Sequence, residues 1–230
     1  MGKSIIQQAR GHGSSVYRVK KRAFQIKPRY PANINEEFEI IKLINSPAHS
    51  APVAKLKAGK EIFFNIAAEG IYEGQKIKIG KDKGDISFLK DLEIGTRIFN
   101  IELKPGDGGK LVRSGGSYAT VLNKSKGIIR IELPSKKVKE FDENCKCTIG
   151  TIAGKDRLDK PILKAGKMFY IKKSKSKKWP LTSAVKVNAI DHPFGSGRGK
   201  RIKSKIAKKN APAGRRVGLL RPRRTGRTKR

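Results

Sequence analysis

The residues best suited to nucleophilic catalysis lie near the C-terminal end of the chain. His192 follows Asp191, and Ser196 comes four residues later, so a nucleophile, a base and an orienting carboxylate are all present. A catalytic triad is defined by the geometry of its groups, and closeness in sequence alone is weak support for one. We therefore interpret His192 as a residue that hydrogen bonds or stacks in the turn before Pro193. We expect no enzymatic activity.

Two glycine clusters, residues 105–110 and 195–201, suggest phosphate binding. Each contains a Gly-Lys pair, but neither has the Ser or Thr that holds magnesium in a P-loop, and neither precedes a predicted helix. Nucleotide hydrolysis is therefore not expected. Glycines nevertheless let a backbone approach a phosphate or sugar closely, and neighbouring bases supply the charge. These bases are Lys110, Arg113, Arg198, Lys200 and Arg201.

The two cysteines, Cys145 and Cys147, are separated by one residue. A disulfide across so short a span would be strained, and a structural zinc ion needs four ligands. The three histidines lie far from the cysteines in sequence. We expect two reduced thiols, no metal site and no cofactor of the protein's own.

Positive charge is concentrated at both ends of the chain, whose formal net charge is +35. Residues 171–230 contain 21 Lys or Arg and one acid, and residues 1–32 contain eight Lys or Arg and no acid. Such segments repel themselves unless a polyanion neutralises them. A membrane-surface protein would instead need an amphipathic basic helix, which glycines and prolines prevent here. The charge predicts a nucleic-acid partner, with no membrane and no small-molecule substrate.

Short β-strands separated by glycine turns are predicted between the basic ends. The expected strands are 38–43, 53–57, 61–66, 75–79 and 85–89, then 96–103, 118–122, 127–133, 137–141 and 147–152. A three-residue loop at 58–60 joins the second strand to the third. The spacing of the first five is typical of a small OB-like barrel. No stretch keeps a helical period beyond about two turns. We predict an all-β body of two barrels, at 33–92 and 93–170, between basic arms at 1–32 and 171–230.

Short motifs along nearly the whole chain resemble those of one family. Each is weak alone, but together their order is specific. They read GKSIIQQARGHG (2–13), SAPVA (50–54), AAEGI (67–71), PGDGGKL (105–111), KPILKAG (160–166), WP (179–180), DHPFG (191–195), NAPAGRRVG (210–218) and RTGR (224–227). On these motifs the chain resembles the universal ribosomal large-subunit protein L-two family, in its archaeal and eukaryotic branch. Ser196 stands where that family usually has the middle one of three glycines.

The resemblance implies an OB-like barrel followed by an SH3-like barrel, with extended basic N- and C-terminal arms. It also implies binding to large-subunit rRNA near the peptidyl-transferase centre, contacts with neighbouring ribosomal proteins and the small subunit, and a role in subunit association and tRNA placement in the cytoplasm. In the family, the loop that matches residues 192–197 reaches toward that centre, where peptide-bond formation is the chemistry of the RNA. The only ions expected are Mg²⁺ or K⁺ held by the rRNA.

The residues expected to contact rRNA are bases, stacking side chains and glycines of the arms and loops. They are Arg10, Arg18, Lys20, Lys21, Arg22, Lys110, Arg113, Lys177, Lys178, Trp179, His192, Pro193, Phe194, Gly195, Gly197, Arg198, Lys200, Arg201, Arg215, Arg216, Arg223, Arg224 and Arg227. Trp179 could stack on a base or anchor the edge of a core. The alternative function is a sequence-tolerant nucleic-acid packaging or regulatory protein outside the ribosome.

Overall fold

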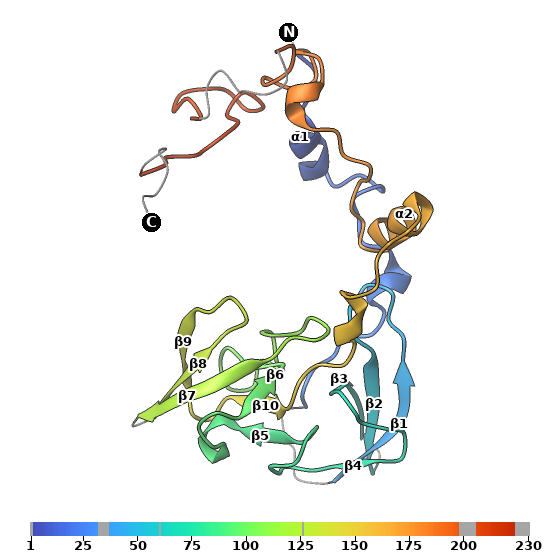
Figure 1. Cartoon of the computed structure of the whole chain (residues 1–230), viewed down its shortest axis with the longest axis vertical. Coiled ribbons are helices and arrows are strands. Elements are labelled where there is room, and N and C mark those ends of the chain that lie inside the picture. Colours follow the sequence, from blue (N-terminus) through green and yellow to red (C-terminus); the bar gives the residue numbers. More distant parts are fainter. Residues whose placement is uncertain (1, 32–36, 60, 126, 198–205, 224–230) are drawn as a thin grey trace. The chain divides into compact units, whose positions relative to one another are not determined.

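The computed structural model describes residues 2–31, 37–59, 61–125, 127–197 and 206–223 (Figure 1). Its contacts divide the chain into two compact units. One, here called the body, is Lys20–Lys164, and the other, the terminal unit, is Met1–Val19 together with Ala165–Arg230. The two ends of the chain therefore belong to one unit, although the sequence predicts two separate arms.

The first sheet of the body has four antiparallel strands in the order β3-β2-β1-β4. They are β1 (Phe38–Ile44), β2 (Val53–Ala58), β3 (Glu61–Ile66) and β4 (Lys76–Ile77). Ala58 pairs with Glu61, so the hairpin loop is one residue shorter than predicted, and Gly59 in it has a φ of +52°. Phe38, Ile40 and Leu56 are buried on one face of this sheet. A register shift between Ile40 and Lys42 interrupts the pairing of β1 with β2, a feature that bends strands.

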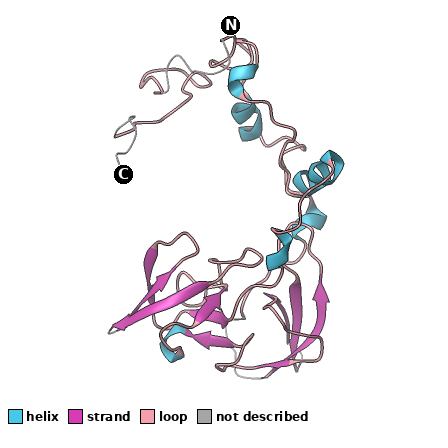
Figure 2. Ribbon diagram, viewed as in Figure 1, coloured by secondary structure: helices cyan, strands magenta, loops and turns pink. Residues whose placement is uncertain are grey.

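The second sheet has six strands in the order β5-β10-β6-β7-β8-β9, with every neighbouring pair antiparallel. They are β5 (Ile86–Phe88), β6 (Arg97–Phe99), β7 (Ala119–Ser125), β8 (Ile128–Glu132), β9 (Val138–Asp142) and β10 (Lys146–Ile149). Its core contains Ile98, Ile101, Val121 and Ile131, none of which is exposed. Figure 2 shows the strands of both sheets in magenta, curled as in small barrels. The predicted fold class, an OB-like and an SH3-like barrel in an all-β body, is confirmed.

Strand β5 differs from its prediction, because it was expected to close the first set. Its backbone pairs with β10 of the six-stranded sheet, while the Ile86 side chain packs in the core of the four-stranded sheet. Ile86 and Ser87 are both buried, so the strand lacks the polar face that would indicate one partner. The barrel boundary at residue 92 stays a prediction.

The body also includes part of the predicted N-terminal arm. Residues 20–31 lie in this unit, where a short 3₁₀ helix, η1 (Lys21–Phe24), precedes an extended stretch. The Tyr30 side chain is buried with Phe38 and Ile40, and its hydroxyl hydrogen bonds with Thr148 Oγ1 at 2.6 Å. Burial raises the pKa of Tyr30 well above its ordinary value. This ring fixes the basic segment to the core.

The remaining helices are short. They are α1 (Ile6–Gly11), η2 (Leu89–Asp91), η3 (Lys155–Arg157), α2 (Ala165–Ser174) and η4 (Ala184–Lys186). Helix α2 was not predicted, because none of its residues is buried and the sequence therefore has no apolar stripe there. Across the described parts of the chain, every helix is too short or too polar to cross a membrane.

Candidate nucleic-acid interface

The terminal unit carries an uncompensated positive charge. Its described residues include 16 Lys or Arg and a single acid, Asp191, which lies 4.0 Å from Lys3 Nζ. Four predicted RNA contacts are grouped in two of its segments, Arg10 and Arg18 in one and Lys177 and Lys178 in the other. The Ser176 hydroxyl donates to the Arg18 carbonyl at 2.7 Å and so joins these segments. The structure therefore brings basic residues from both ends of the chain onto one unit.

The loop after β6 uses its glycines for contacts within the protein. The Glu102 carboxylate, which is fully buried, accepts hydrogen bonds from the amides of Gly106 (3.2 Å), Gly108 (2.9 Å) and Lys146 (2.9 Å). Gly108 has a φ of +83°, which favours glycine. The two loop glycine amides thus bind a carboxylate of the protein. The glycine cluster therefore has a structural role, which the interpretation of the cluster as a phosphate-binding loop did not include.

Asp107 closes the same loop and neutralises one of its bases. Its carboxylate accepts hydrogen bonds from the amides of Leu103 (3.0 Å) and Gly109 (3.1 Å) and lies 3.4 Å from Lys110 Nζ. Burial raises the pKa of Asp107, but these donors and Lys110 outweigh it, and the pKa is lowered overall. About half of the Lys110 side chain remains exposed. Lys110 therefore stays accessible to a phosphate.

Arg113, the other base predicted near this loop, has a structural role. Its guanidinium donates to the carbonyls of Gly109 at 3.3 Å and Pro28 at 3.0 Å. Burial lowers the pKa of Arg113, since the guanidinium loses water that would stabilise its charge. The side chain links the loop to the segment that carries Tyr30. Its contact with RNA stays a prediction.

The loop at residues 187–197 does not assemble a catalytic triad. His192 Nδ1 accepts a hydrogen bond from the Phe194 amide at 3.1 Å, and the two rings pack with centroids 5.0 Å apart. Ser196 Oγ accepts from the Ala189 amide at 3.0 Å. Within the described part of the chain, no hydrogen bond joins any two of His192, Asp191 and Ser196. The His192 and Ser196 side chains instead hold the loop in shape, and the Asp191 carboxylate lies near Lys3.

Gly195 and Ser196 explain how this loop turns. A Cβ at Gly195 would collide with the carbonyl oxygen of Val187, so the position needs glycine for close packing of the backbone on itself. Ser196 has a φ of +58°, a conformation that is ordinarily left to glycine or asparagine. Its amide donates to Val187 and its hydroxyl accepts from Ala189. A glycine at position 196 would keep the turn but lose the second bond.

The other predicted contacts are spread over the chain. Lys20 and Lys21 lie at the start of η1 in the body, and Trp179 is half-buried after α2. Arg215 and Arg223 are exposed, as is Arg216, which donates to the Lys209 carbonyl at 2.7 Å. Pro193 and Gly197 are exposed in the His192 loop. Arg198, Lys200, Arg201, Arg224, Arg227 and the side chain of Arg22 lie outside what the structure describes.

A basic cluster on the body was missed by the sequence interpretation. Lys83, Arg97 and Lys155 lie near enough to the exposed Glu69 to act on it electrostatically, and its pKa is lowered first by the Thr151 hydroxyl and then by these cations. The Arg97 guanidinium also lies 4.7 Å from the centre of the Tyr118 ring. The three bases come from separate segments, so no local pattern could have found them. Three cations beside one carboxylate leave a net positive surface suited to phosphate.

Metal binding has little support in these side chains. In the residues that the structure describes, no three or more His, Cys, Asp or Glu groups are placed to hold an ion. The Cys147 thiol is buried and its pKa is raised by that burial. The expectation that the protein has no cofactor of its own stays a prediction.

Comparison with known proteins identifies the family. The family model described as Ribosomal Proteins L2, C-terminal domain, matches residues 82–214. The large ribosomal subunit protein uL2 of Hyperthermus butylicus is 41% identical over 239 residues, which cover 100% of both chains. The chain belongs to the ribosomal protein L2 family. This membership confirms the resemblance drawn from the motifs.

Two further L2-family proteins match over nearly their whole length. The uL2 of Metallosphaera sedula is 40% identical over 234 residues, covering 99% of this chain and 98% of the relative. The uL2 of Archaeoglobus fulgidus is 39% identical over 237 residues, covering 98% and 99%. These alignments cover almost the full length of this chain. The aligned regions therefore include nearly all of both basic ends of this chain.

Proposed function

We propose that this L2-family protein is a structural component of the large ribosomal subunit that binds large-subunit rRNA near the peptidyl-transferase centre. The observation that carries the proposal is the charge of the terminal unit. Its described residues include 16 Lys or Arg and one acid, Asp191, which already lies close to Lys3. The relatives that align with almost the full length of this chain are named as large ribosomal subunit proteins. We place the protein in the cytoplasm, where it contacts neighbouring ribosomal proteins and the small subunit.

The mechanism is scaffolding. The body docks on folded RNA through exposed bases such as Lys110 and the cluster of Lys83, Arg97 and Lys155. The terminal segments pass between RNA helices, and their bases release the counterions condensed on the phosphates. Tight turns such as the one at Gly195 let these segments follow an irregular RNA surface. In this way the protein supports subunit association and tRNA placement without taking part in bond chemistry.

Salt dependence tests the role of the basic C-terminal segment. For duplex-like RNA the logarithm of the binding constant falls against the logarithm of salt concentration with a slope of about −0.9 per neutralised phosphate. Deleting residues 171–230 should flatten this slope severely and leave the β signal of the body in circular dichroism. A slope equal to that of the full chain would refute the assignment of affinity to this segment.

Co-sedimentation separates the proposal from a packaging protein. A ribosomal component stays with the large subunit through a high-salt wash, because its segments are threaded between RNA helices. A sequence-tolerant binder is released, since its affinity rests on exchangeable phosphate contacts. Release of the full-length protein at that step would favour the packaging function.

His192 provides a separate test of the non-enzymatic role. Its ring packs on Phe194 and its Nδ1 is already hydrogen bonded, which suits a structural RNA contact. His192→Ala should therefore leave peptidyl transfer intact in ribosomes shown to be fully assembled. Abolished transfer in such particles would contradict this role.

A further inference from the structure

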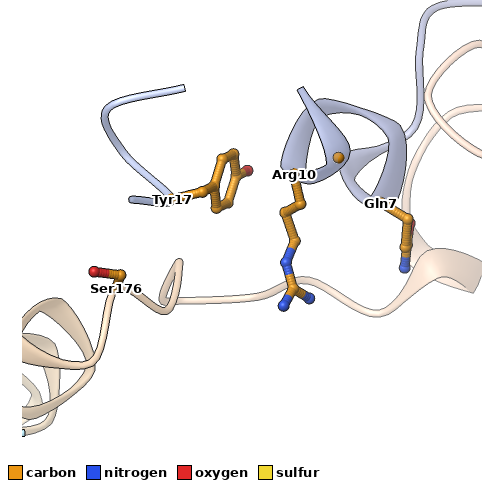
Figure 3. Close-up of a pocket in the computed structure, with 5 residues that line it drawn as sticks. Gln7, Arg10, Tyr17 and Ser176 are labelled. Carbon is orange, nitrogen blue, oxygen red and sulfur yellow. The ribbon is translucent and has the colours of Figure 1, made fainter. Parts of the chain in front are cut away.

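The terminal unit contains a pocket that the RNA-binding role does not by itself explain. It has a volume of about 350 Å³ and is lined by Gln7, Arg10, Gly11, Tyr17 and Ser176 (Figure 3). This lies within the range of about 300–1,000 Å³ that is usual for small-molecule sites. In Figure 3 the Tyr17 ring lies on one side of the Arg10 side chain and Gln7 on the other.

Hydrogen bonds hold the walls of the pocket. The Tyr17 amide donates to the Ser14 carbonyl at 2.9 Å, and the Arg18 guanidinium donates to the Gly13 carbonyl at 2.7 Å. Ser176 is tied to Arg18 through its hydroxyl. The turn that carries Tyr17 is therefore fixed both to the end of α1 and to the segment after α2. These bonds hold in place the backbone that carries the Tyr17 ring.

The lining combines the groups that recognise one nucleotide. Arg10 lines the pocket, and its guanidinium can bind a phosphate through two parallel N–H donors. Tyr17 offers a flat ring on which a base can stack. The Gln7 amide and the Ser176 side chain can hydrogen bond with a base edge or a 2′-hydroxyl. The nearby charge favours an anion, because Asp191 is the single acid among the described residues of this unit.

We infer that the pocket binds one ribonucleotide of an RNA chain, with its base turned out of the stack onto Tyr17 and its phosphate on Arg10. The inference rests on the proposed RNA-binding function and adds a specific position to it. A free ribonucleotide has the same chemistry. The chain-borne nucleotide is favoured because bases directly follow two of the lining residues, Arg18 after Tyr17 and Lys177 and Lys178 after Ser176, and can neutralise neighbouring phosphates.

Gly11 allows the pocket to be filled without removing a charge. A Cβ at Gly11 would meet no atom within 4 Å, and its backbone is not in the left-handed region. Gly11→Leu therefore adds a side chain in open space at the end of α1. Gly11→Ala is the matched control, because it makes the same backbone change and fills little of the volume. Tyr17→Leu removes the stacking ring, and Tyr170→Leu removes an exposed tyrosine of the same unit as its control.

The probe is a single-stranded RNA of seven uridines in which the central base is replaced by 2-aminopurine, whose fluorescence is quenched by stacking. The full-length protein should quench it. Tyr17→Leu and Gly11→Leu should abolish the quench and weaken binding about fivefold or more, as expected for the loss of one base–aromatic stack. Neither variant should change the salt slope, whereas Arg10→Ala should reduce it by about 0.7, the value for one phosphate on a single strand.

The outcomes separate the inference from the proposed function. A quench that survives both Tyr17→Leu and Gly11→Leu, or that is lost equally in Tyr170→Leu, overturns the pocket while leaving RNA binding intact. Equal quenching of free 2-aminopurine riboside monophosphate at the same concentrations shows a free-nucleotide site and overturns the assignment to an RNA chain. Absence of RNA binding by the unchanged protein overturns the proposed function as well.

Discussion

Replacing Glu102 by Gln tests whether one buried carboxylate organises the glycine loop of the body. In the native loop, Oε1 accepts from Gly108 at 2.9 Å, and Oε2 accepts from Gly106 at 3.2 Å and Lys146 at 2.9 Å. Glutamine keeps one oxygen and replaces the other by an NH₂ group. If its oxygen stays with the two donors of Oε2, its NH₂ faces the Gly108 amide, and a buried donor meets a donor.

The expected cost follows from these contacts. A hydrogen bond to a charged group contributes about 1.5–3 kcal/mol, and an unsatisfied buried donor costs roughly 1–3 kcal/mol. Removing a charge from the interior offsets part of this sum. We expect Glu102→Gln to lower the free energy of unfolding by about 3 kcal/mol, a large share of the roughly 5–15 kcal/mol of a typical domain.

Urea unfolding followed by far-ultraviolet circular dichroism measures this loss. The matched control is Glu140→Gln, the same chemical change at a residue that pairs with Arg130 at 3.0 Å while both side chains are more than half exposed. Such a surface pair contributes at most about 1 kcal/mol. If Glu102→Gln costs no more than Glu140→Gln, the carboxylate does not organise the loop and the reasoning is refuted.

Three other predictions concern the glycine turns, the thiols and the His192 loop. Gly109→Ala should destabilise the body by about 1–3 kcal/mol more than Gly74→Ala in urea unfolding. Both glycines have φ above +80°, but a Cβ at position 109 would collide with Asn100, including its backbone, while a Cβ at position 74 would meet no atom within 4 Å. Equal losses would contradict this. Burial raises the pKa of Cys145 to about 11, so the folded protein should resist thiol reagents at pH 8. The same shift makes the free energy of unfolding depend on pH. Because burial raises the pKa only in the folded state, the stability contributed by the protonated Cys145 thiol is complete below the free-thiol pKa of about 8.5 and is lost as pH rises toward 11. A free energy of unfolding that stays constant over this pH range would count against the prediction. Ser196→Ala should speed hydrogen exchange at the Ala189 amide, whose acceptor it removes, and unchanged exchange would show that the bond is not formed in solution.

Local patterns were sufficient to predict the strands. The hairpin at residues 53–66 is predicted from the glycine turn between two apolar runs, and the strand at 128–132 from the short β segment that follows Gly127. Strand β5 is harder to place from its pattern. Ile86 and Ser87 are both buried, and the strand pairs with β10 while Ile86 also bridges to Ile79 of the first set.

The site was less predictable, because its geometry depends on contacts between distant segments. The glycine cluster at 105–110 indicates close approach of a phosphate to the backbone, whereas in the structure the Gly106 and Gly108 amides bind the Glu102 carboxylate. The cluster around Glu69 needs Lys83, Arg97 of β6 and Lys155 of η3, which are far apart in sequence, so it has no sequence signature. Charge counting located the basic ends, because net charge needs no geometry; their contact with RNA stays a prediction.

The terminal unit combines both ends of the chain, and this determines the order in which the two units can form during synthesis. A chain leaves the ribosome from its N-terminus, so Lys20–Lys164 can complete its contacts while later residues are still being made. Residues 2–19 emerge first but find their partners last, because Lys3 bonds with Ile190 and Arg18 bonds with Ser176. The pocket lined by Tyr17 therefore cannot form before Ser176 has been made. An RNA contact made there would be unavailable to copies that end before residue 176.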